Sequence, residues 1–305
     1  MRAYRYQRID VFTDRPFGGN PLAVFPTAQG LETAEMQLLA REMNLSETTF
    51  VLPPTSEAAV ARVRIFTVDR ELPLAGHPVV GTAFALASSG AFEVGEGDNE
   101  VAFELGAGVL PVHVAMQGGR VDSVFMTQRA PRFGPVVEDS ALLASALSLE
   151  ADELGLDILS ARVVDTGIPW LLIPVRNQRA LAKVSADPRF CSQLAEAVGT
   201  DLVHAFTLDT GDPGCAVRTR HVWWGPVTPG EDPVTGSAIG CIASYLVAEG
   251  VILAAPQAEI VIEQGYEVGR PGQVTARVAV SGDSVSRVVV GGRAVHVGNG
   301  EIWLD

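Results

Sequence analysis

The feature that most constrains this chain is a pair of apolar segments set in an otherwise strand-rich sequence. Residues 78–90 carry no charge, and residues 233–250 carry none except Glu249. Both segments are rich in alanine and end at a glycine, so they predict helices that are apolar on every side and therefore buried. Strands predicted from alternation or short apolar runs surround each segment, so we expect sheets wrapped around buried helices.

The two apolar segments also match each other in sequence. His77–Ala83 aligns with Asp232–Ala238 at an offset of 155 residues, close to half of the 305-residue chain, with four of seven positions identical. Such a repeat predicts two similar halves. We therefore predict an α+β fold of two pseudo-symmetric halves, each a β-barrel-like curled sheet around one buried central helix. The N-terminal half is expected at 1–125, with the last strand (about 290–305) able to complete it, and the C-terminal half at 126–289.

Composition argues against several classes of function. A net charge of -14 predicts no nucleic-acid or anionic-membrane partner. Lys183 is the only lysine, and neither a Gly-Lys-Ser/Thr loop nor a glycine-rich phosphate cradle accompanies it, as a phosphate-binding or pyridoxal site requires. The cysteines (Cys191, Cys215, Cys241) and the five histidines lack metal-ligand spacing, so we expect no metal and no cofactor. No signal-peptide or membrane-spanning pattern appears, which predicts a cytoplasmic protein.

Proline is favoured at the first position of a helix, where its missing N–H group is not needed. Pro78 and Pro233 therefore predict helix starts, with His77 and Asp232 as the N-cap residues. Aspartate is a common N-cap, so Asp232 has an ordinary structural explanation. Histidine is not a preferred cap, so a functional role for His77 stays open.

Small residues follow both predicted helix starts: Gly81 and Thr82 in the first, Gly236 and Ser237 in the second. They predict first-turn N–H groups that a ligand can approach, and helix N-termini bind carboxylates. Two such ends facing one cleft would hold a substrate carboxylate and stabilise an enolate-like charge. The glycines could equally let a sheet pack closely, and the hydroxyl residues could simply be small.

A candidate base is Glu47, which stands between a predicted helix and an apolar strand. An acid that leads into a buried strand is expected to have a raised pKa, which suits it to proton abstraction. The alternative is an ordinary solvated glutamate.

Several motifs stand in a specific order along the chain. They are "DVFTDRPFGGNPLAVF", "LAREMNLSETTFV", "RIFTVDRELPLAGHPVVGTAFAL", "GEDPVTGSAIG" and "EQGYEVGRPG". Together, from the first predicted strand to the last, they resemble the phenazine-biosynthesis-like (PhzF-like) isomerases of the diaminopimelate epimerase-like superfamily. The resemblance implies two barrel-like halves with an active site in the cleft between them, a homodimer and no cofactor.

Characterised members of that family isomerise a cyclic dihydro-hydroxyanthranilate-type compound by moving a proton. The resemblance therefore implies a function for this chain as a cofactor-independent isomerase of a small carboxylate-bearing metabolite, cyclic compounds included. It places the catalytic residues at Glu47, His77 and Asp232, and the substrate-binding residues at Gly76, Gly236 and Ser237.

The chain departs from the family pattern at Val68, at Trp223 and Trp224 within "HVWWGPVTPGEDP", and at Gly272. These positions are expected at pocket edges, so the substrate can differ from the phenazine precursor. Related epimerases use two cysteines as acid and base, but none of the three cysteines here aligns with those positions. Two-base thiol chemistry is therefore not expected.

Two other functions remain open at this stage. An epimerase or racemase of an amino or hydroxy acid would use Glu47 opposite His77 or Asp232 and invert one stereocentre. A non-catalytic protein of the same fold would bind small anions without turnover. The complete set of Glu47, His77, Asp232 and Ser237 favours catalysis over binding alone.

Overall fold

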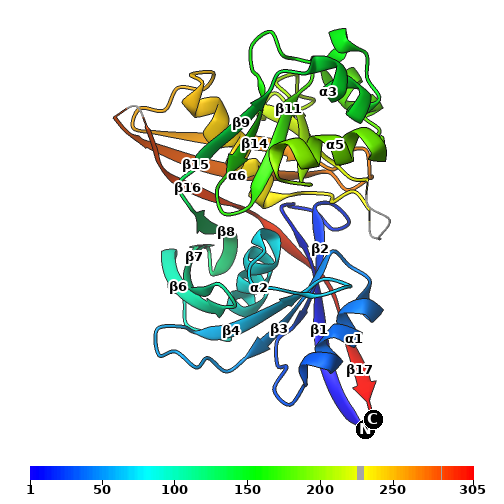
Figure 1. Ribbon diagram of the computed structural model, residues 1–305. Coiled ribbons are helices and arrows are strands. Elements are labelled where there is room, and N and C mark those ends of the chain that lie inside the picture. Colours follow the sequence, from blue (N-terminus) through cyan, green and yellow to red (C-terminus); the bar gives the residue numbers. More distant parts are fainter. Residues whose placement is uncertain (225–229, 283) are drawn as a thin grey trace. The chain divides into compact units, whose positions relative to one another are not determined.

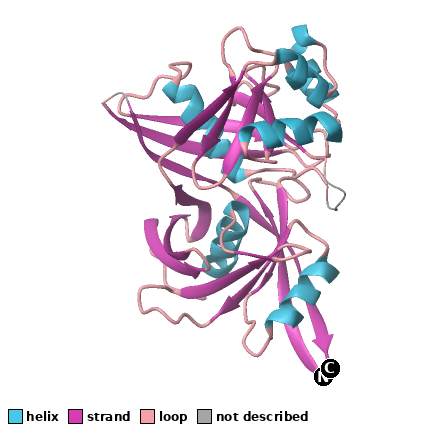
Figure 2. Cartoon of the chain, in the orientation of Figure 1, coloured by secondary structure: helices cyan, strands magenta, loops and turns pink. Residues whose placement is uncertain are grey.

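The computed structural model describes residues 1–224, 230–282 and 284–305. These residues form two compact units, which we treat separately (Figure 1). Unit 1 comprises Met1–Thr127 and Gly291–Asp305, and unit 2 comprises Gln128–Val290. Figure 2 shows that strands dominate both units. No helix among the described residues is both long enough and apolar enough to cross a membrane.

The elements follow the chain in order. The first part contains β1 Arg2–Val11, β2 Asn20–Phe25, α1 Thr33–Met43, β3 Glu47–Leu52, β4 Ala61–Phe66, β5 Glu71–Leu72, α2 Gly76–Ser88, β6 Gly97–Leu105, β7 Gly108–Gln117 and β8 Arg120–Gln128. It is followed by β9 Arg132–Val137, α3 Ser140–Leu147, the 3-10 helix Ala151–Glu153, β10 Ala161–Asp165, β11 Pro169–Pro174, α4 Gln178–Lys183, α5 Pro188–Val198, β12 Val203–Thr207, β13 Val217–Val222, α6 Gly236–Ala248, β14 Gln257–Gln264, β15 Gly272–Ser281, β16 Ser284–Gly292 and β17 Ala294–Leu304.

The two units share one order of strand pairing. In unit 1, β1 is antiparallel to β2, β2 parallel to β3, β3 antiparallel to β4, β4 parallel to β6, and β6 antiparallel to β7. In unit 2, β10 to β15 repeat the same sequence of pairings with α6 in the place of α2. A flanking strand adds to each first strand, β17 to β1 and β9 to β10. Each unit is therefore a copy of one topology.

A buried helix occupies the middle of each unit. Ten of the thirteen residues of α2 are buried, and so are ten of the thirteen of α6. The first helix packs on β1, β2, β3 and β7, as Figure 1 also shows, and the second on β10, β11 and β15. A helix that is apolar on every side is stable when it is buried, and both central helices are largely buried, as predicted from the two apolar segments.

Close packing explains Gly81, which lies in the middle of α2. A Cβ atom there would stand 2.6 Å from both Val11 Cγ2 and Leu22 Cδ2, side chains of β1 and β2. Of the two explanations left open for this glycine, the structure supports sheet packing.

The two central helices begin elsewhere than predicted. The N-cap residues are Ala75 and Thr235, so His77 is the second residue of α2, and Asp232 lies in the loop before α6. The predicted N-cap roles of His77 and Asp232 are therefore wrong. Proline is tolerated at any first-turn position that lacks an intrahelical N–H partner, so Pro78 does not mark the first residue.

The register of the predicted repeat changes accordingly. The helices start at Gly76 and Gly236, 160 residues apart, whereas the sequence match has an offset of 155. Gly76 and His77 thus correspond to Gly236 and Ser237, and Gly81 is not in a first turn. The short match rested on small residues and proline, which recur easily in apolar helices, so it revealed the repeat but misplaced its register.

Shorter elements follow local signals. The helix predicted before Glu47 is α1, where Glu32 and Glu35 form a capping box and Asn44 adopts the left-handed conformation at the end. The six-residue α4 was not predicted. Its N-cap is Asn177, whose side chain accepts a hydrogen bond from the Ala180 N–H. Six residues are too few for a periodic pattern.

Candidate active site

Unit 1 gathers Asn20, Glu47 and His77, which we call the Glu47 cluster. Asn20 is the first residue of β2 and Glu47 the first residue of β3, and these strands run parallel. Parallel neighbours bring their starting residues to one edge of a sheet. His77, in the first turn of α2, reaches this edge, where its Nε2 atom lies 3.3 Å from Glu47 Oε2.

Hydrogen bonding defines the state of the His77 ring. The Asn20 side-chain nitrogen lies 3.2 Å from His77 Nδ1, and an amide nitrogen can only donate. Nδ1 therefore accepts, and a neutral ring carries its proton on Nε2, the atom nearest Glu47. Burial lowers the pKa of His77 to about 3, so the ring is neutral at physiological pH.

The carboxylate of Glu47 is largely withdrawn from water. Its side chain is 16% exposed, and the His77 side chain beside it 6%. A carboxyl group at the border of a buried region can still exchange a proton with a ligand that reaches its open side. The structure therefore brings the predicted residues Glu47 and His77 together, with the predicted Gly76 half-buried next to them in the chain.

Unit 2 gathers Asp232 and Ser237 with partners that no sequence pattern predicted. We call this group the Asp232 cluster: Trp170, His221, Asp232, Thr235, Ser237 and Gln264. The Thr235 hydroxyl donates to Asp232 Oδ2 at 2.6 Å, and the Gln264 amide nitrogen donates to the Asp232 carbonyl at 2.8 Å. The Asp232 N–H donates to His221 Nδ1 at 3.0 Å. Side chain and backbone of Asp232 are thus all held in place.

Gln264 holds the residues directly before α6. Besides the Asp232 carbonyl it contacts Thr235 twice, accepting from the backbone N–H at 3.0 Å and donating to the hydroxyl at 3.2 Å. The next residue, Gly265, has φ +91°, and a Cβ atom there would stand 2.7 Å from the Pro233 carbonyl oxygen. Glycine at this position therefore allows the end of β14 to lie directly against the loop.

Two further histidines stack beneath this loop. His204 and His221 are a cross-strand pair of β12 and β13, and their ring centroids lie 5.6 Å apart. Burial lowers the pKa of His221 to about 4. Burial, and then the neighbouring His221, hold the pKa of His204 well below its usual value. Neutral His221 leaves Nδ1 free to accept from Asp232, so its own proton is on Nε2.

The predicted substrate-binding residues Gly236 and Ser237 begin α6. Gly236 is buried, Ser237 is half-buried, and the Ser237 hydroxyl oxygen accepts a hydrogen bond from Trp170 Nε1 at 3.2 Å. Trp223 is 40% exposed and lies against His221, while Trp224 packs on the core of unit 2. The rest of that segment, residues 225–229, lies outside the described residues.

The three cysteines are poorly suited to acid–base catalysis. Cys191, Cys215 and Cys241 are all buried. Burial raises the pKa of their thiols to about 11, 12 and 12, respectively. These thiols stay protonated at neutral pH and are weak bases. Among the residues that the structure describes, no three His, Cys, Asp or Glu side chains are grouped to hold a metal ion.

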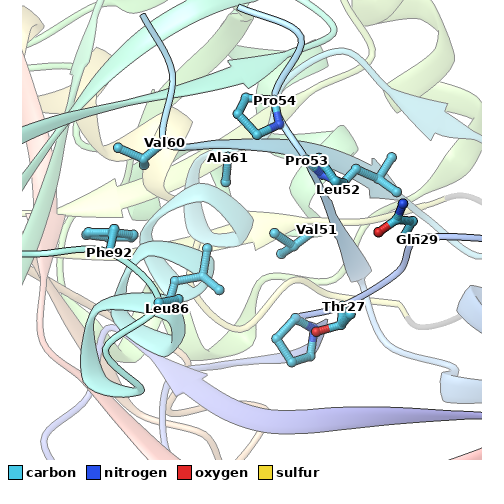
Figure 3. Close-up of a pocket in the computed structure, with 12 residues that line it drawn as sticks. Thr27, Gln29, Val51, Leu52, Pro53, Pro54, Val60, Ala61, Leu86 and Phe92 are labelled. Atoms are coloured by element: carbon cyan, nitrogen blue, oxygen red, sulfur yellow. The ribbon is translucent and has the colours of Figure 1, made fainter. Parts of the chain in front are cut away.

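A cavity of about 220 Å³ lies elsewhere in unit 1, near the end of α2. Pro53, Pro54, Leu86 and Phe92 are among the residues that line it (Figure 3). None of the predicted site residues lines this cavity, and its lining carries no titratable side chain. It is separate from the Glu47 cluster.

Sequence reasoning missed the residues that hold the candidate acids and bases. Asn20 and Gln264 both lie in quoted motifs, "GNPLAV" and "EQGYEVGRPG", which are the signal that could have identified them. Trp170 and His221 stand in ordinary strand patterns. Only the pairing of distant strands brings them to Ser237 and Asp232.

Known proteins resemble this chain in both sequence and structure. Residues 9–300 match the phenazine biosynthesis-like protein family. An uncharacterized isomerase of Mesorhizobium japonicum is 34% identical over 322 residues, with 100% of both chains covered. The trans-2,3-dihydro-3-hydroxyanthranilate isomerase of Pseudomonas chlororaphis is 35% identical over 305 residues, covering 99% of this chain and 100% of the relative. A solved structure of a Bacillus anthracis phenazine biosynthesis protein, PhzF family, has a TM-score of 0.88 at 30% identity and covers both chains fully. The family and fold class predicted from the motifs are confirmed.

Proposed function

The chain belongs to the phenazine biosynthesis-like protein family and is an isomerase, and we propose that it moves a proton on a small carboxylate-bearing metabolite without a cofactor. The observation that carries the proposal is the Glu47 cluster: a largely buried carboxyl 3.3 Å from a neutral imidazole. A carboxylate beside a neutral ring can accept a proton from carbon, because that ring places no positive charge next to it.

The proposed reaction begins with the loss of a proton. The Glu47 carboxylate removes a proton from a carbon that is acidified by a conjugated carboxylate or double bond. The C–H bond breaks, an O–H bond forms on Glu47, and the electron pair shifts along the conjugated system. The proton on the Glu47 carboxyl exchanges with solvent, and Glu47 then delivers a proton to a different carbon, so substrate and product are isomers and no oxidant or reductant takes part.

Other residues have supporting roles in this proposal. The Nε2–H group of His77 faces the proton-transfer site and stabilises charge there, and the held carboxylate of Asp232 orients the substrate or relays protons. Gly76, Gly236 and Ser237 would bind the substrate carboxylate through first-turn N–H groups and a hydroxyl. We further propose that both clusters act on one substrate.

The substrate class comes from the relatives. Several are named trans-2,3-dihydro-3-hydroxyanthranilate isomerase. One of these is 35% identical to this chain, and the match covers the whole length of that relative. That compound is the first substrate to test, with related cyclic carboxylates beside it, because Val68, Trp223 and Gly272 depart from the family pattern. The resemblance also supports a homodimer in the cytoplasm, which we retain as part of the proposal.

The test is Glu47→Gln, which keeps the size of the side chain and removes the base. Incubated with trans-2,3-dihydro-3-hydroxyanthranilate in D2O, the wild type is expected to incorporate deuterium and the variant to lose at least about a thousandfold in rate. Binding of 3-hydroxyanthranilate, a stable aromatic analogue, is expected to persist. Glu42→Gln, an exposed position on α1, is the matched control and should retain wild-type exchange. Undiminished exchange in Glu47→Gln would overturn the assignment.

A further inference from the structure

Trp170 is a buried side chain that the proposed mechanism does not use, yet it contacts a proposed substrate-binding residue. It is the second residue of β11, 5% exposed, and its indole Nε1–H donates to Ser237 Oγ at 3.2 Å. We propose that Trp170 is a positioning residue that directs the Ser237 hydroxyl proton toward the substrate carboxylate. This inference rests on the proposed function, because it takes Ser237 as a carboxylate ligand.

The direction of the hydrogen bond carries the argument. An indole N–H can only donate, whereas a serine hydroxyl has one proton and two acceptor lone pairs. When Ser237 accepts from Trp170, its own proton must point elsewhere. Ser237 is half-buried in the first turn of α6. The backbone N–H groups of a first turn favour the binding of an anion. A Ser237 hydroxyl oriented as a donor gives the anion one more hydrogen bond. A hydroxyl oriented the other way would present its oxygen to the anion and repel it.

The indole ring is rigidly held. It meets the His204 ring edge-to-face at 4.9 Å between centroids and the His221 ring at 5.7 Å. His204 is fixed by Thr219, whose hydroxyl lies 2.8 Å from its Nδ1 and itself donates to the Ala205 carbonyl. Because that hydroxyl proton is used, His204 Nδ1 is the donor in its bond with Thr219.

The same packing connects Ser237 to Asp232. His221 contacts the Trp170 ring and also accepts the hydrogen bond of the Asp232 N–H. Burial lowers the pKa of both histidine rings, so neither ring places a positive charge next to the indole at neutral pH. Trp170 thus orients the hydroxyl of Ser237. The His221 ring that packs against Trp170 also accepts the hydrogen bond of the Asp232 N–H.

The alternative is that Ser237 merely satisfies a buried indole N–H, since buried tryptophans commonly find such a partner. The two readings differ in the ligand group that responds. A positioning role affects a carboxylate, which takes the Ser237 proton as an acceptor. A merely structural role would alter the affinity for charged and neutral ligands alike.

The experiment uses Trp170→Phe, which keeps an aromatic ring and removes the N–H donor. Titration calorimetry compares 3-hydroxyanthranilate with 2-aminophenol, the analogue that lacks the carboxylate. We expect Trp170→Phe to weaken binding of the carboxylate about fivefold to tenfold and to leave binding of 2-aminophenol unchanged. In a Ser237→Ala background the same substitution should have no further effect, because Trp170 acts through Ser237. Trp303→Phe, an exposed position on β17, is the matched control. Equal losses for both ligands, or additive effects of the two substitutions, would overturn the proposal.

A second measurement needs no ligand. In a spectrum of 15N-labelled tryptophan, the signal missing from Trp170→Phe identifies the Trp170 indole proton. We expect Ser237→Ala to move that signal upfield as the hydrogen bond is lost, and an unmoved signal would refute the contact. If the signal moves but the wild type does not bind the carboxylate, the proposed substrate class fails, and with it the positioning role. If the wild type binds the carboxylate and only the Trp170 effects are missing, the proposed function stands and this inference alone fails.

Discussion

Two of the buried histidines, His77 and His221, each accept a hydrogen bond at Nδ1. His77 Nδ1 accepts from the Asn20 amide, and His221 Nδ1 accepts from the Asp232 N–H. Both contacts require an unprotonated Nδ1, and burial supplies it by lowering the pKa of each ring, to about 3 and about 4. A protonated ring would have to give up the acceptor role, so the geometry around Glu47 and Asp232 depends on neutral imidazoles.

A pH dependence of stability follows for His221. Its folded pKa of about 4 lies below the ordinary value of 6.5, so between these values the unfolded chain binds a proton that the folded chain does not. This contribution to the free energy of unfolding therefore decreases as pH falls from 6.5 to 4, by about 1.4 kcal/mol per pH unit, and levels off below pH 4.

His221→Asn keeps an acceptor near the Nδ1 position and removes the titration. Urea unfolding of both proteins between pH 7 and 4 is expected to give a shallower pH slope for the variant. Parallel slopes would contradict the account, because His77, His204 and the carboxyl groups titrate in both proteins.

At this scale the sequence predicted the candidate side chains that lie together in unit 1, but not the residues that hold the candidates in place. Glu47 and His77 were expected on the strength of motif and resemblance, and they lie 3.3 Å apart. Asn20 and Gln264 act through amide groups, whose chemistry leaves no charge signature in a sequence. Trp170 and Ser237 are 67 residues apart in the sequence, and only the folded sheet brings them into contact.

At the scale of elements, the central helices determine how closely the strands approach. The apolar, uncharged pattern was sufficient to predict both as buried helices. It could not define where they begin, because first-turn positions tolerate proline, glycine and small residues alike. The loop before α6 is instead set by Gln264 and Thr235, contacts that depend on the end of β14 lying beside it.

Gly81→Ala tests the packing of α2. The added methyl would stand 2.6 Å from Val11 and Leu22 side-chain atoms in a closely packed core, where β1 and β2 would have to move. We expect a loss of about 1–3 kcal/mol in the free energy of unfolding, measured in urea, despite the better helix propensity of alanine.

Gly298→Ala is the matched control for this substitution, since no atom lies within 4 Å of the Cβ position there. It should change stability by less than about 0.5 kcal/mol. An unchanged or increased stability of Gly81→Ala would show that α2 does not depend on that close approach.

At the scale of the molecule, the chain builds one topology twice, and its last strand then returns to unit 1. After unit 2, β17 pairs with β1 along its whole length, from Arg2 opposite Leu304 to Val11 opposite Ala294. The repeated pairing order, rather than the similarity of a seven-residue segment, is what makes the two units copies of one plan. Alternation predicted most of the strands, but pairing between residues some 300 apart leaves no periodic trace in a single sequence.

The acidic character of the whole chain coexists with proposed local sites for an anion. A net charge of -14 argues against polyanionic partners. First-turn N–H groups at Gly76 and Gly236 and the hydroxyl of Ser237 do not enter that charge count. A small carboxylate can therefore bind where a nucleic acid would be repelled, which is consistent with an isomerase of a small metabolite.

The position of deuterium in the product tests the central claim most directly. Trans-2,3-dihydro-3-hydroxyanthranilate turned over in D2O by the wild-type protein is followed by NMR at each ring carbon. Our account predicts that one carbon loses its proton and that deuterium appears at a different carbon, with the double bond shifted between them. Deuterium on the carbon that lost the proton, with its configuration inverted, would instead identify an epimerase and contradict the account.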